Sequence, residues 1–340
     1  MRKTSLTLLI LSLVAFLAYL FWPAPSLEQQ MQNRYVPAVG IGVIKGGKVI
    51  RNEVLGELEA DEPATPDAIF NVASLTKPVF AMLVLKLVEL GEWDLDSPIH
   101  PHWIDHEIKE DVRHELLTTR ILLSHQSGFP NWRWNHPSGK LAFEFDPGTR
   151  YQYSGEGFEY LKNAIQQKTG KPLQSLVDSL LFIPLGMPHS SLVWGADMEQ
   201  KPFAKWHDKK GGVYDTYKRK EGLAADDLLT TVNDYCTFSL DVINGAGLSP
   251  DLYEEMISPQ VKVNRKVDYG LGWLVVKNLS NGEYALVHSG ADQGVRTMVI
   301  LLPQSKSGVI VFTNGDKGNK IIRRLMRENC PYGREILSAL

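Results

Sequence analysis

Cysteine is scarce in this sequence, and neither sign of charge dominates. Only Cys236 and Cys330 occur among the 340 residues, which excludes a framework of several disulfides but leaves open whether these two pair. We expect Cys236 to be a small buried side chain in a helix and Cys330 to be a terminal thiol. Lys and Arg number 36 against 39 Asp and Glu, and no long basic run occurs. Because clustered basic residues bind phosphate backbones, we expect no nucleic-acid partner.

Two hydrolase motifs are missing or incomplete. The Gly-x-Ser-x-Gly motif of α/β-hydrolases does not occur, which excludes that class. A stretch similar to the zinc-binding pattern His-x-His-x-Asp-His has one extra residue before the aspartate, and consists of His100, His102, Asp105 and His106. Zinc needs a fixed tetrahedral set of ligands, and the extra residue changes which side chains converge. We therefore expect solvated histidines in a loop, and neither a metal nor an organic cofactor.

The N-terminus carries the one long apolar run. Arg2 and Lys3 precede a nearly unbroken apolar stretch from Leu6 to Trp22, which predicts an export signal in residues 1–26. The run is slightly shorter than the roughly 20 residues that span a bilayer, and no convincing small-x-small cleavage site follows it. We expect residues 5–22 to remain as a membrane anchor, with the rest on the periplasmic or extracellular side. Cleavage that frees a soluble protein is the alternative.

The remaining composition, with 44% hydrophobic and 22% charged residues, is that of a folded globular protein. β-branched runs at 38–44 and 48–51 flank Gly46-Gly47 and predict a hairpin. Apolar residues at helical spacing predict a helix from Ser74 to Leu90. Strand patterns follow at 271–276, 284–288, 297–302 and 308–313, and an amphipathic helix begins near Gly318.

Strands at both ends of the chain with helices between them predict an α/β fold. Residues 27–94 and 265–340 would together form an α/β domain, with an antiparallel sheet flanked by helices. Residues 95–264, in which helical stretches alternate with loops rich in Gly, Pro and Trp, would form a mostly helical inserted domain.

A candidate nucleophile lies where the first long helix begins. Ser74-Leu75-Thr76-Lys77 is the one Ser-x-x-Lys in the chain, and three residues of helix place Lys77 on the same face as Ser74. A serine hydroxyl needs a nearby base, and a partly desolvated Lys amine can accept its proton. A helix-capping Ser with a surface Lys is the simpler interpretation of this motif taken alone.

Several motifs in the same order resemble those of the serine β-lactamase and penicillin-binding-protein superfamily, closest to its class C and esterase-like branch. The resemblance covers most of the chain. It is carried by Phe70 to Lys77, Leu122 to Pro130, Tyr151 to Gly155, Pro184 to Met187, Tyr269 to Trp273 and His288-Ser289-Gly290. It implies the fold of that superfamily and an acyl-enzyme mechanism.

The resemblance also implies roles for individual residues. Ser74 would be the nucleophile, Lys77 its proton acceptor and Tyr153 a second acid/base. The backbone N–H groups of Ser74 and Ala291 would form an oxyanion hole. His288 would hydrogen-bond near Tyr153 or the substrate, with Ser289 and Gly290 at the substrate site. Taken alone, Tyr153 could be a packed aromatic residue and His288 a strand residue with no role in chemistry.

Two departures from the family pattern bear on the substrate. Gly155 stands where related enzymes carry an Asn that holds an acyl-side amide, and Glu156 follows it. His288 stands where many carry a Lys that attracts a substrate carboxylate, and a histidine is mostly neutral near pH 7. Both departures favour an ester, or a differently recognised amide, as the substrate. An acylatable cell-wall sensor without turnover is the alternative function.

Overall fold

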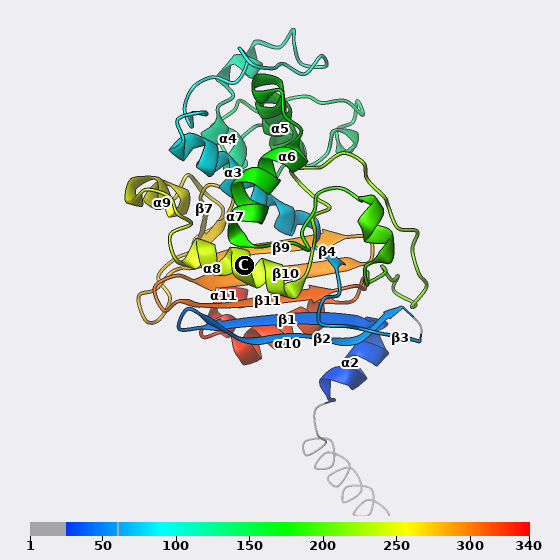
Figure 1. Cartoon of the computed structure of the whole chain (residues 1–340). Helices are drawn as coiled ribbons and strands as arrows, with labels where there is room; N and C mark the ends of the chain where they lie inside the picture. Colours follow the sequence, from blue (N-terminus) through cyan, green and yellow to red (C-terminus); the bar gives the residue numbers. More distant parts are fainter. Residues whose placement is uncertain (1–24, 60) are drawn as a thin grey trace, which may run out of the picture.

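The computed structural model describes residues 25–59 and 61–340, and its centre is one antiparallel sheet (Figure 1). Each neighbouring pair of its nine strands is antiparallel. The strands, in spatial order, are β3 (Glu62–Pro63), β2 (Lys48–Glu59), β1 (Ala38–Lys45), β11 (Ser307–Thr313), β10 (Val295–Leu302), β9 (Ala285–Asp292), β8 (Leu274–Val276), β7 (Val267–Tyr269) and β6 (Val261–Lys262). The N-terminal hairpin β1–β2 therefore pairs with the C-terminal strand β11, which confirms the antiparallel sheet built from both ends of the chain.

Successive residues of β1 point to opposite faces of the sheet, and the two faces pack against different helices. Gly40 and Gly42 face helix α8 (Val232–Ile243), where a Cβ on Gly40 would lie 2.5 Å from the Val232 side chain. A Cβ on Gly42 would lie 2.3 Å from Cys236 Sγ. The two glycines thus let α8 pack close against the sheet, because no side chain separates them. Cys236 is buried here in a helix, as expected, and is a free thiol.

The opposite face of the sheet is covered by helices from the two ends of the chain (Figure 1). Val39, Ile41 and Val43 of β1 point to this side, where they join a buried apolar cluster. The cluster includes residues of α2 (Leu27–Arg34), α10 (Asn319–Asn329) and α11 (Gly333–Ala339). Cys330, at the end of α10, is a second free and buried thiol. The amphipathic helix predicted from near Gly318 is therefore confirmed, and it closes one side of the core.

The other helices lie beyond α8, on the far side from α10 (Figure 1). The most buried of them is α3 (Thr76–Glu89), in which 11 side chains are buried. The α-helices around it are α4 (Thr119–Leu123), α5 (Gly155–Thr169), α6 (Leu173–Val177), α7 (Ile183–Leu185) and α9 (Pro250–Ile257). Short helical turns and a two-stranded pair complete this region: η1 (Ala73–Leu75), η2 (Val112–Leu116), η3 (Arg133–Asn135), η4 (Asp178–Phe182), η5 (Ala196–Gln200), β4 (Phe70–Asn71) and β5 (Leu229–Thr230).

Two expected elements differ from the structure. The strand predicted over 271–276 covers only Leu274–Val276. Gly272 has a φ of +84°, which a strand does not accommodate, and its N–H donates to the Leu123 carbonyl instead of a neighbouring strand. The helix predicted from Ser74 begins as the 3₁₀ turn η1 and becomes α-helical at Thr76.

Two other expectations concern the N-terminal segment and the division into domains. The predicted signal or anchor, residues 1–26, lies almost wholly outside the described residues. Within the described ranges, no helix is long and apolar enough to cross a membrane. The division into an α/β domain and an inserted domain at 95–264 stays a prediction, and one helix of that segment, α8, packs on the sheet itself.

Candidate active site

The turn that carries Ser74 is held in an uncommon conformation. Ala73, directly before it, has a φ of +49°, a region that costs a non-glycine residue roughly 1–2 kcal/mol. The Ala73 N–H donates to Asn71 Oδ1 at 2.7 Å, and Thr76 Oγ1 donates to the Ala73 carbonyl at 2.6 Å. These two bonds hold the turn from both sides and set the place of the Ser74 side chain.

Two segments distant in the chain fix the same turn. The Leu228 N–H donates to Thr76 Oγ1 at 2.9 Å, and the Val72 N–H donates to the Leu228 carbonyl at 3.0 Å. On the other side, Thr297 Oγ1 of β10 donates to the Val72 carbonyl at 2.9 Å. The serine turn is therefore attached both to the segment before β5 and to the central sheet.

Lys77 points back to Ser74, as the spacing predicts. Its Nζ lies 3.1 Å from Ser74 Oγ and 2.7 Å from the carbonyl oxygen of Ala225. The side chain is buried, with 1% exposure. Nζ also lies 4.8 Å from the centre of the Tyr153 ring. The amine is thus held against the serine hydroxyl, and a surface position for this Lys is excluded.

A cavity of about 420 Å³ opens beside this pair. Ser74 lies in its wall, together with four of the other predicted site residues, Tyr153, His288, Ser289 and Ala291. The remaining lining residues are Asn131, Trp132, Tyr151, Asp226, Tyr269 and Leu274. One cavity therefore collects residues from segments about 200 positions apart, and it lies where the motifs predicted chemistry.

Tyr153 owes its position to a buried histidine. The rings of His125 and Tyr153 lie 4.3 Å apart between centres. His125 Nδ1 accepts a hydrogen bond from the Ser154 N–H at 3.0 Å, and its Nε2 lies 3.1 Å from the Tyr269 hydroxyl. Because Nδ1 accepts, the proton of the neutral ring is on Nε2 and is donated to Tyr269. Burial, and the charge of Lys77, hold the pKa of His125 well below its usual value.

His288 lines the cavity and is neutral, with one unpartnered acceptor. Its Nδ1 lies 3.0 Å from the Ser289 carbonyl oxygen, so Nδ1 carries the proton and Nε2 is a bare acceptor. Burial, and then the charge of Lys77, lower the pKa of His288 to about 3. The residue is 2% exposed, and Nε2 has no partner among the described residues. A neutral acceptor does not attract a carboxylate as a lysine would.

Strand β9 passes close to the serine turn. A Cβ on Gly290 would lie 2.4 Å from the Val72 carbonyl oxygen and 3.1 Å from the Ser74 nitrogen. Ser289 and Ala291, on either side of Gly290, both line the cavity. Gly290 itself is absent from the lining, and its contribution is the close approach of β9 to Ser74.

The Gly155 position has no room for a side chain. A Cβ there would lie 2.9 Å from the Trp132 ring and 3.1 Å from the Asn131 carbonyl. Asn131 lines the cavity, and its Oδ1 accepts from the Gly155 N–H at 2.9 Å. The carboxamide that the family pattern would place at 155 is therefore available from residue 131.

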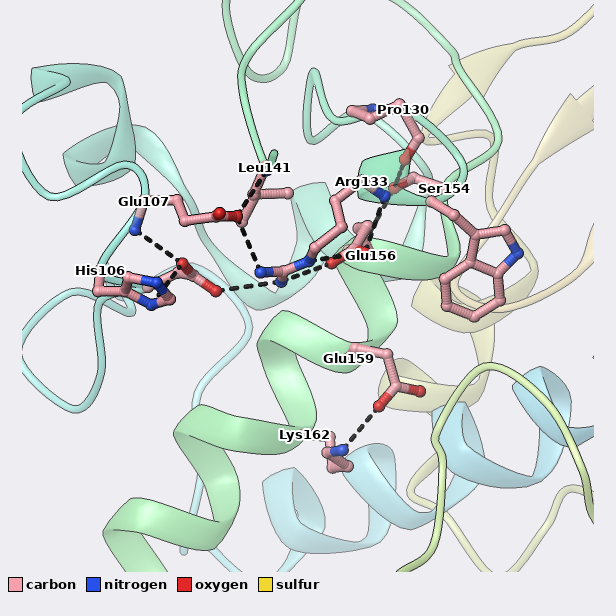
Figure 2. A network of polar contacts seen from close by, with 12 residues as sticks. His106, Glu107, Pro130, Arg133, Leu141, Ser154, Glu156, Glu159 and Lys162 are labelled. Carbon is pink, nitrogen blue, oxygen red and sulfur yellow. Dashed lines mark hydrogen bonds and ion pairs between the residues drawn. The ribbon is translucent and has the colours of Figure 1, made fainter. Parts of the chain in front are cut away.

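Glu156 does not face the cavity but holds Arg133 (Figure 2). The guanidinium makes bonds of 3.1 and 2.9 Å to the Glu156 carboxylate, and the Arg133 N–H donates to the same group at 2.9 Å. Asp105 and Glu107 complete the network at 3.1 and 3.0 Å. These carboxylates raise the pKa of Arg133 above its usual value. The network fixes the loop that carries Asn131 and Trp132.

An acidic group lies at one side of the cavity. Asp226 lines it, and carboxylate oxygens of Asp226, Asp227 and Asp292 lie within 4.8 Å of one another. In the described part of the chain this is the one set of His, Cys, Asp or Glu side chains with a spacing that could surround a cation. Arg219 forms an ion pair with Asp227. Burial, together with the charge of Asp227, raises the pKa of Asp226 to about 8.

The histidines of the zinc-like stretch are not gathered around a common point. Asp105 is bound by Arg133, the side chain of His106 is 84% exposed, and the ring of His102 packs on Trp93 at 5.2 Å. The extra residue before Asp105 thus leaves these side chains with separate partners.

Sequence reasoning missed several residues around the cavity. Asn131 and Trp132 directly follow the motif Leu122 to Pro130, so the neighbourhood of that motif could have indicated them. His125 lies inside the motif, but the motif by itself indicates no role for it. No sequence pattern indicated Asp226, because two adjacent Asp residues in a loop are common.

A family model and several known proteins match this chain. The family model described as Beta-lactamase matches residues 25–327. Protein flp of Staphylococcus aureus (strain NCTC 8325 / PS 47) is 23% identical, over 85% of this chain and 61% of flp. The chain thus spans about three fifths of the length of the first curated relatives that it matches.

An esterase and a solved structure are also similar to this chain. Esterase EstB of Burkholderia gladioli is 32% identical over 209 residues, which are 52% of each chain. The crystal structure of a beta-lactamase/D-alanine carboxypeptidase from Pseudomonas syringae superposes with a TM-score of 0.74. That match covers 89% of this chain and 97% of the other at 17% identity, so it shows a shared fold.

Proposed function

This chain belongs to the beta-lactamase family, and we propose that it hydrolyses an ester or an amide through an acyl-enzyme on Ser74. The observation that carries the proposal is the 3.1 Å contact between Lys77 Nζ and Ser74 Oγ at the wall of a cavity that Tyr153 and His288 also line. The likeness to an esterase in the matched half of the chain supports the same class of reaction.

The proposed reaction has two steps. Ser74 Oγ bonds to the substrate carbonyl carbon while Lys77 Nζ accepts its proton. The backbone N–H groups of Ser74 and Ala291 stabilise the oxyanion, and the leaving group departs with a proton delivered through Tyr153. Water then attacks the acyl carbon and gives up a proton by the same route. The bond to Ser74 breaks, the acid is released and the serine hydroxyl is restored.

The side chains favour some substrates over others. A neutral His288 with an unprotonated Nε2 offers no positive charge to a substrate carboxylate. Penicillins and peptides ending in D-alanine both carry that carboxylate. We therefore place carboxyl-free esters and amides first as substrates.

The test measures intact protein mass after incubation with a neutral fluorophosphonate and, separately, with a penicillin. We expect one phosphonate adduct on the wild type and on the control Ser97→Ala, and none on Ser74→Ala. Lys77→Ala should react at least about a thousandfold more slowly. A folded wild type that takes up no phosphonate would contradict the proposal. A burst of acylation without turnover of esters would select the sensor function instead.

We also propose that the protein acts beyond the cytoplasmic membrane and is held there by residues 5–22. The apolar run Leu6 to Trp22 after Arg2 and Lys3 supports this location. Cell fractionation should find the full-length mass in the membrane fraction, released by detergent but not by salt. Recovery of a shortened, freely soluble chain would show that the segment is cleaved.

A further inference from the structure

Two of the residues that line the cavity beside Ser74, His288 and Asp226, carry hydrogen-bond acceptors. His288 Nε2 is unprotonated, buried and without a partner among residues 25–59 and 61–340. The carboxyl group of Asp226 lines the same cavity. A ligand that satisfies both must bring N–H or O–H groups, and a positive charge suits the second of them.

The acidic group at this side of the cavity has few ion-pair partners. Asp226, Asp227 and Asp292 lie together, and Arg219 pairs with Asp227. The other nearby guanidinium, Arg296, is paired with Asp316 at 3.2 Å. The described residues therefore leave at least one carboxyl group of the three without a cation of its own.

The segment that carries Asp226 is firmly positioned. The N–H groups of Ala224 and Ala225 donate to Glu159 Oε1 at 2.8 and 2.9 Å, and the Ala225 carbonyl accepts from Lys77. Figure 2 shows Glu159 on α5, with its ion pair to Lys162. Because Asp226 follows the residue that anchors Lys77, its carboxyl group has a fixed relation to the reacting atoms.

We propose that the cavity selects an ester or amide substrate that carries a protonated primary amine, which Asp226 binds beside Ser74. This inference rests on the proposed function and names the substrate class for it. The ammonium would donate a hydrogen bond to the Asp226 carboxylate, and its charge would balance the negative charge that this carboxyl group gains when it loses its proton.

Two further observations support an amine as the ligand of Asp226. The raised pKa of Asp226 means that the empty cavity tends to keep a proton on this carboxyl group, and a ligand cation can take the place of that proton. A divalent metal is disfavoured because the Arg219 guanidinium already pairs with Asp227, which removes one of its three possible carboxylate ligands.

The test compares two pairs of substrates in which an ammonium replaces a methyl group of the same size. The first pair, β-alanyl and butyryl p-nitrophenyl esters, carries the difference in the acyl part. The second pair, aminomethylphenyl and ethylphenyl acetates, carries it in the leaving group. We expect kcat/KM to favour the amine about tenfold or more in at least one pair. A ratio near one in both pairs would overturn the proposal without any variant.

Variants test whether Asp226 causes the preference for amine substrates. Asp226→Asn should bring the amine-to-methyl ratio close to one, whereas the control Asp251→Asn, on the exposed start of α9, should keep the wild-type ratio. A preference that survives in folded Asp226→Asn would overturn the assignment to this residue. Both substrates of a pair are measured on the same variant, so a general loss of activity cancels in the amine-to-methyl ratio of kcat/KM.

Two control measurements distinguish failure of the amine preference from failure of the acyl-enzyme, and an amine site from a metal site. Phosphonate labelling of Ser74, followed on the same samples, reports the proposed function alone. If Ser74 is labelled but no amine preference is found, only the amine proposal is wrong. If Ser74 is not labelled, the proposed acyl-enzyme is wrong. Calcium, magnesium and zinc are titrated by calorimetry after removal of metal by a chelator. Binding that Asp226→Asn abolishes would assign the acidic group to a metal and overturn the amine proposal.

Discussion

The ring of His125 packs against the ring of Tyr153, with 4.3 Å between their centres and 39° between their planes. His125 has a φ of +57° and is fully buried. Its two ring nitrogens are bound to the Ser154 N–H and to the Tyr269 hydroxyl. One buried histidine thus ties the loop of the proposed acid/base to a second tyrosine that lines the cavity.

Replacing His125 should therefore loosen Tyr153. His125→Ala removes the ring and leaves a buried N–H and a buried hydroxyl without partners, so unfolding in urea should show a loss of about 3 kcal/mol. If the ring positions Tyr153, kcat for an ester should fall more than tenfold with little change in KM.

His125→Asn is the conservative variant for this prediction, because its amide oxygen can accept from the Ser154 N–H. It should regain part of both stability and kcat. His106→Ala, which changes an exposed histidine, is the control and should match the wild type. A normal kcat in folded His125→Ala would contradict the positioning role.

Two buried neutral histidines each contribute a loss of stability in mild acid, against the opposite contribution of Asp226. The pKa values of His125 and His288 are lowered in the folded state, mainly by burial, the latter to about 3. Above the unfolded pKa of about 6.5 both states are neutral and these residues add nothing. As the pH falls below that value, only the unfolded state takes up protons, and each histidine costs about 1.4 kcal/mol per pH unit.

Urea unfolding at several pH values between about 7 and 5 measures this slope. His288→Asn should reduce it by about half of the histidine contribution. An unchanged slope in this variant would show that His288 titrates normally in the folded protein.

Gly290 should tolerate no side chain. In Gly290→Ala the new methyl group would meet Thr297 Oγ1 at 2.3 Å and the Val72 carbonyl at 2.4 Å, so β9 must move away from Ser74. We expect phosphonate labelling to slow by about a hundredfold or more, since a displacement of about 1 Å is enough.

The matched control is Gly157→Ala in α5. Its new methyl group meets Ser127 at an ordinary 3.4 Å, and alanine favours helix. This variant should label at the wild-type rate with equal or slightly higher stability. Equal labelling rates in the two alanine variants would argue against close packing of β9 on the serine turn.

Arg133 should matter more for stability than exposed arginines do. Arg133→Met leaves the 4% exposed Glu156 without its main partner, and an unpaired buried carboxylate costs about 3 kcal/mol. Because the network holds the loop of Asn131 and Trp132, KM for an ester should rise as well.

Arg324→Met is the comparison, since the partner Glu328 is half exposed and such pairs contribute about 0.5 kcal/mol. Thermal unfolding of both variants measures the difference. Equal losses would mean that the Arg133 network contributes no more than a surface ion pair.

What could be predicted from the sequence is local or repeated along the chain. The hairpin around Gly46-Gly47 and the alternation in β1 follow from the geometry of strands and turns, and both are found. The contact of Lys77 with Ser74 follows in the same way, because three residues of helix bring two side chains together. Motif order was enough to indicate the fold and five of the residues in the cavity wall.

What only the tertiary structure decided depends on groups far apart in the chain. Lys77 and the Ala225 carbonyl are 148 positions apart, and this contact brings Asp226 beside the serine. No local pattern indicates that His288 keeps a buried acceptor without a partner, or that Glu156 turns away to Arg133. Burial and hydrogen-bond partners set the charge of a side chain and the atom it presents, and both arise only when distant segments pack together.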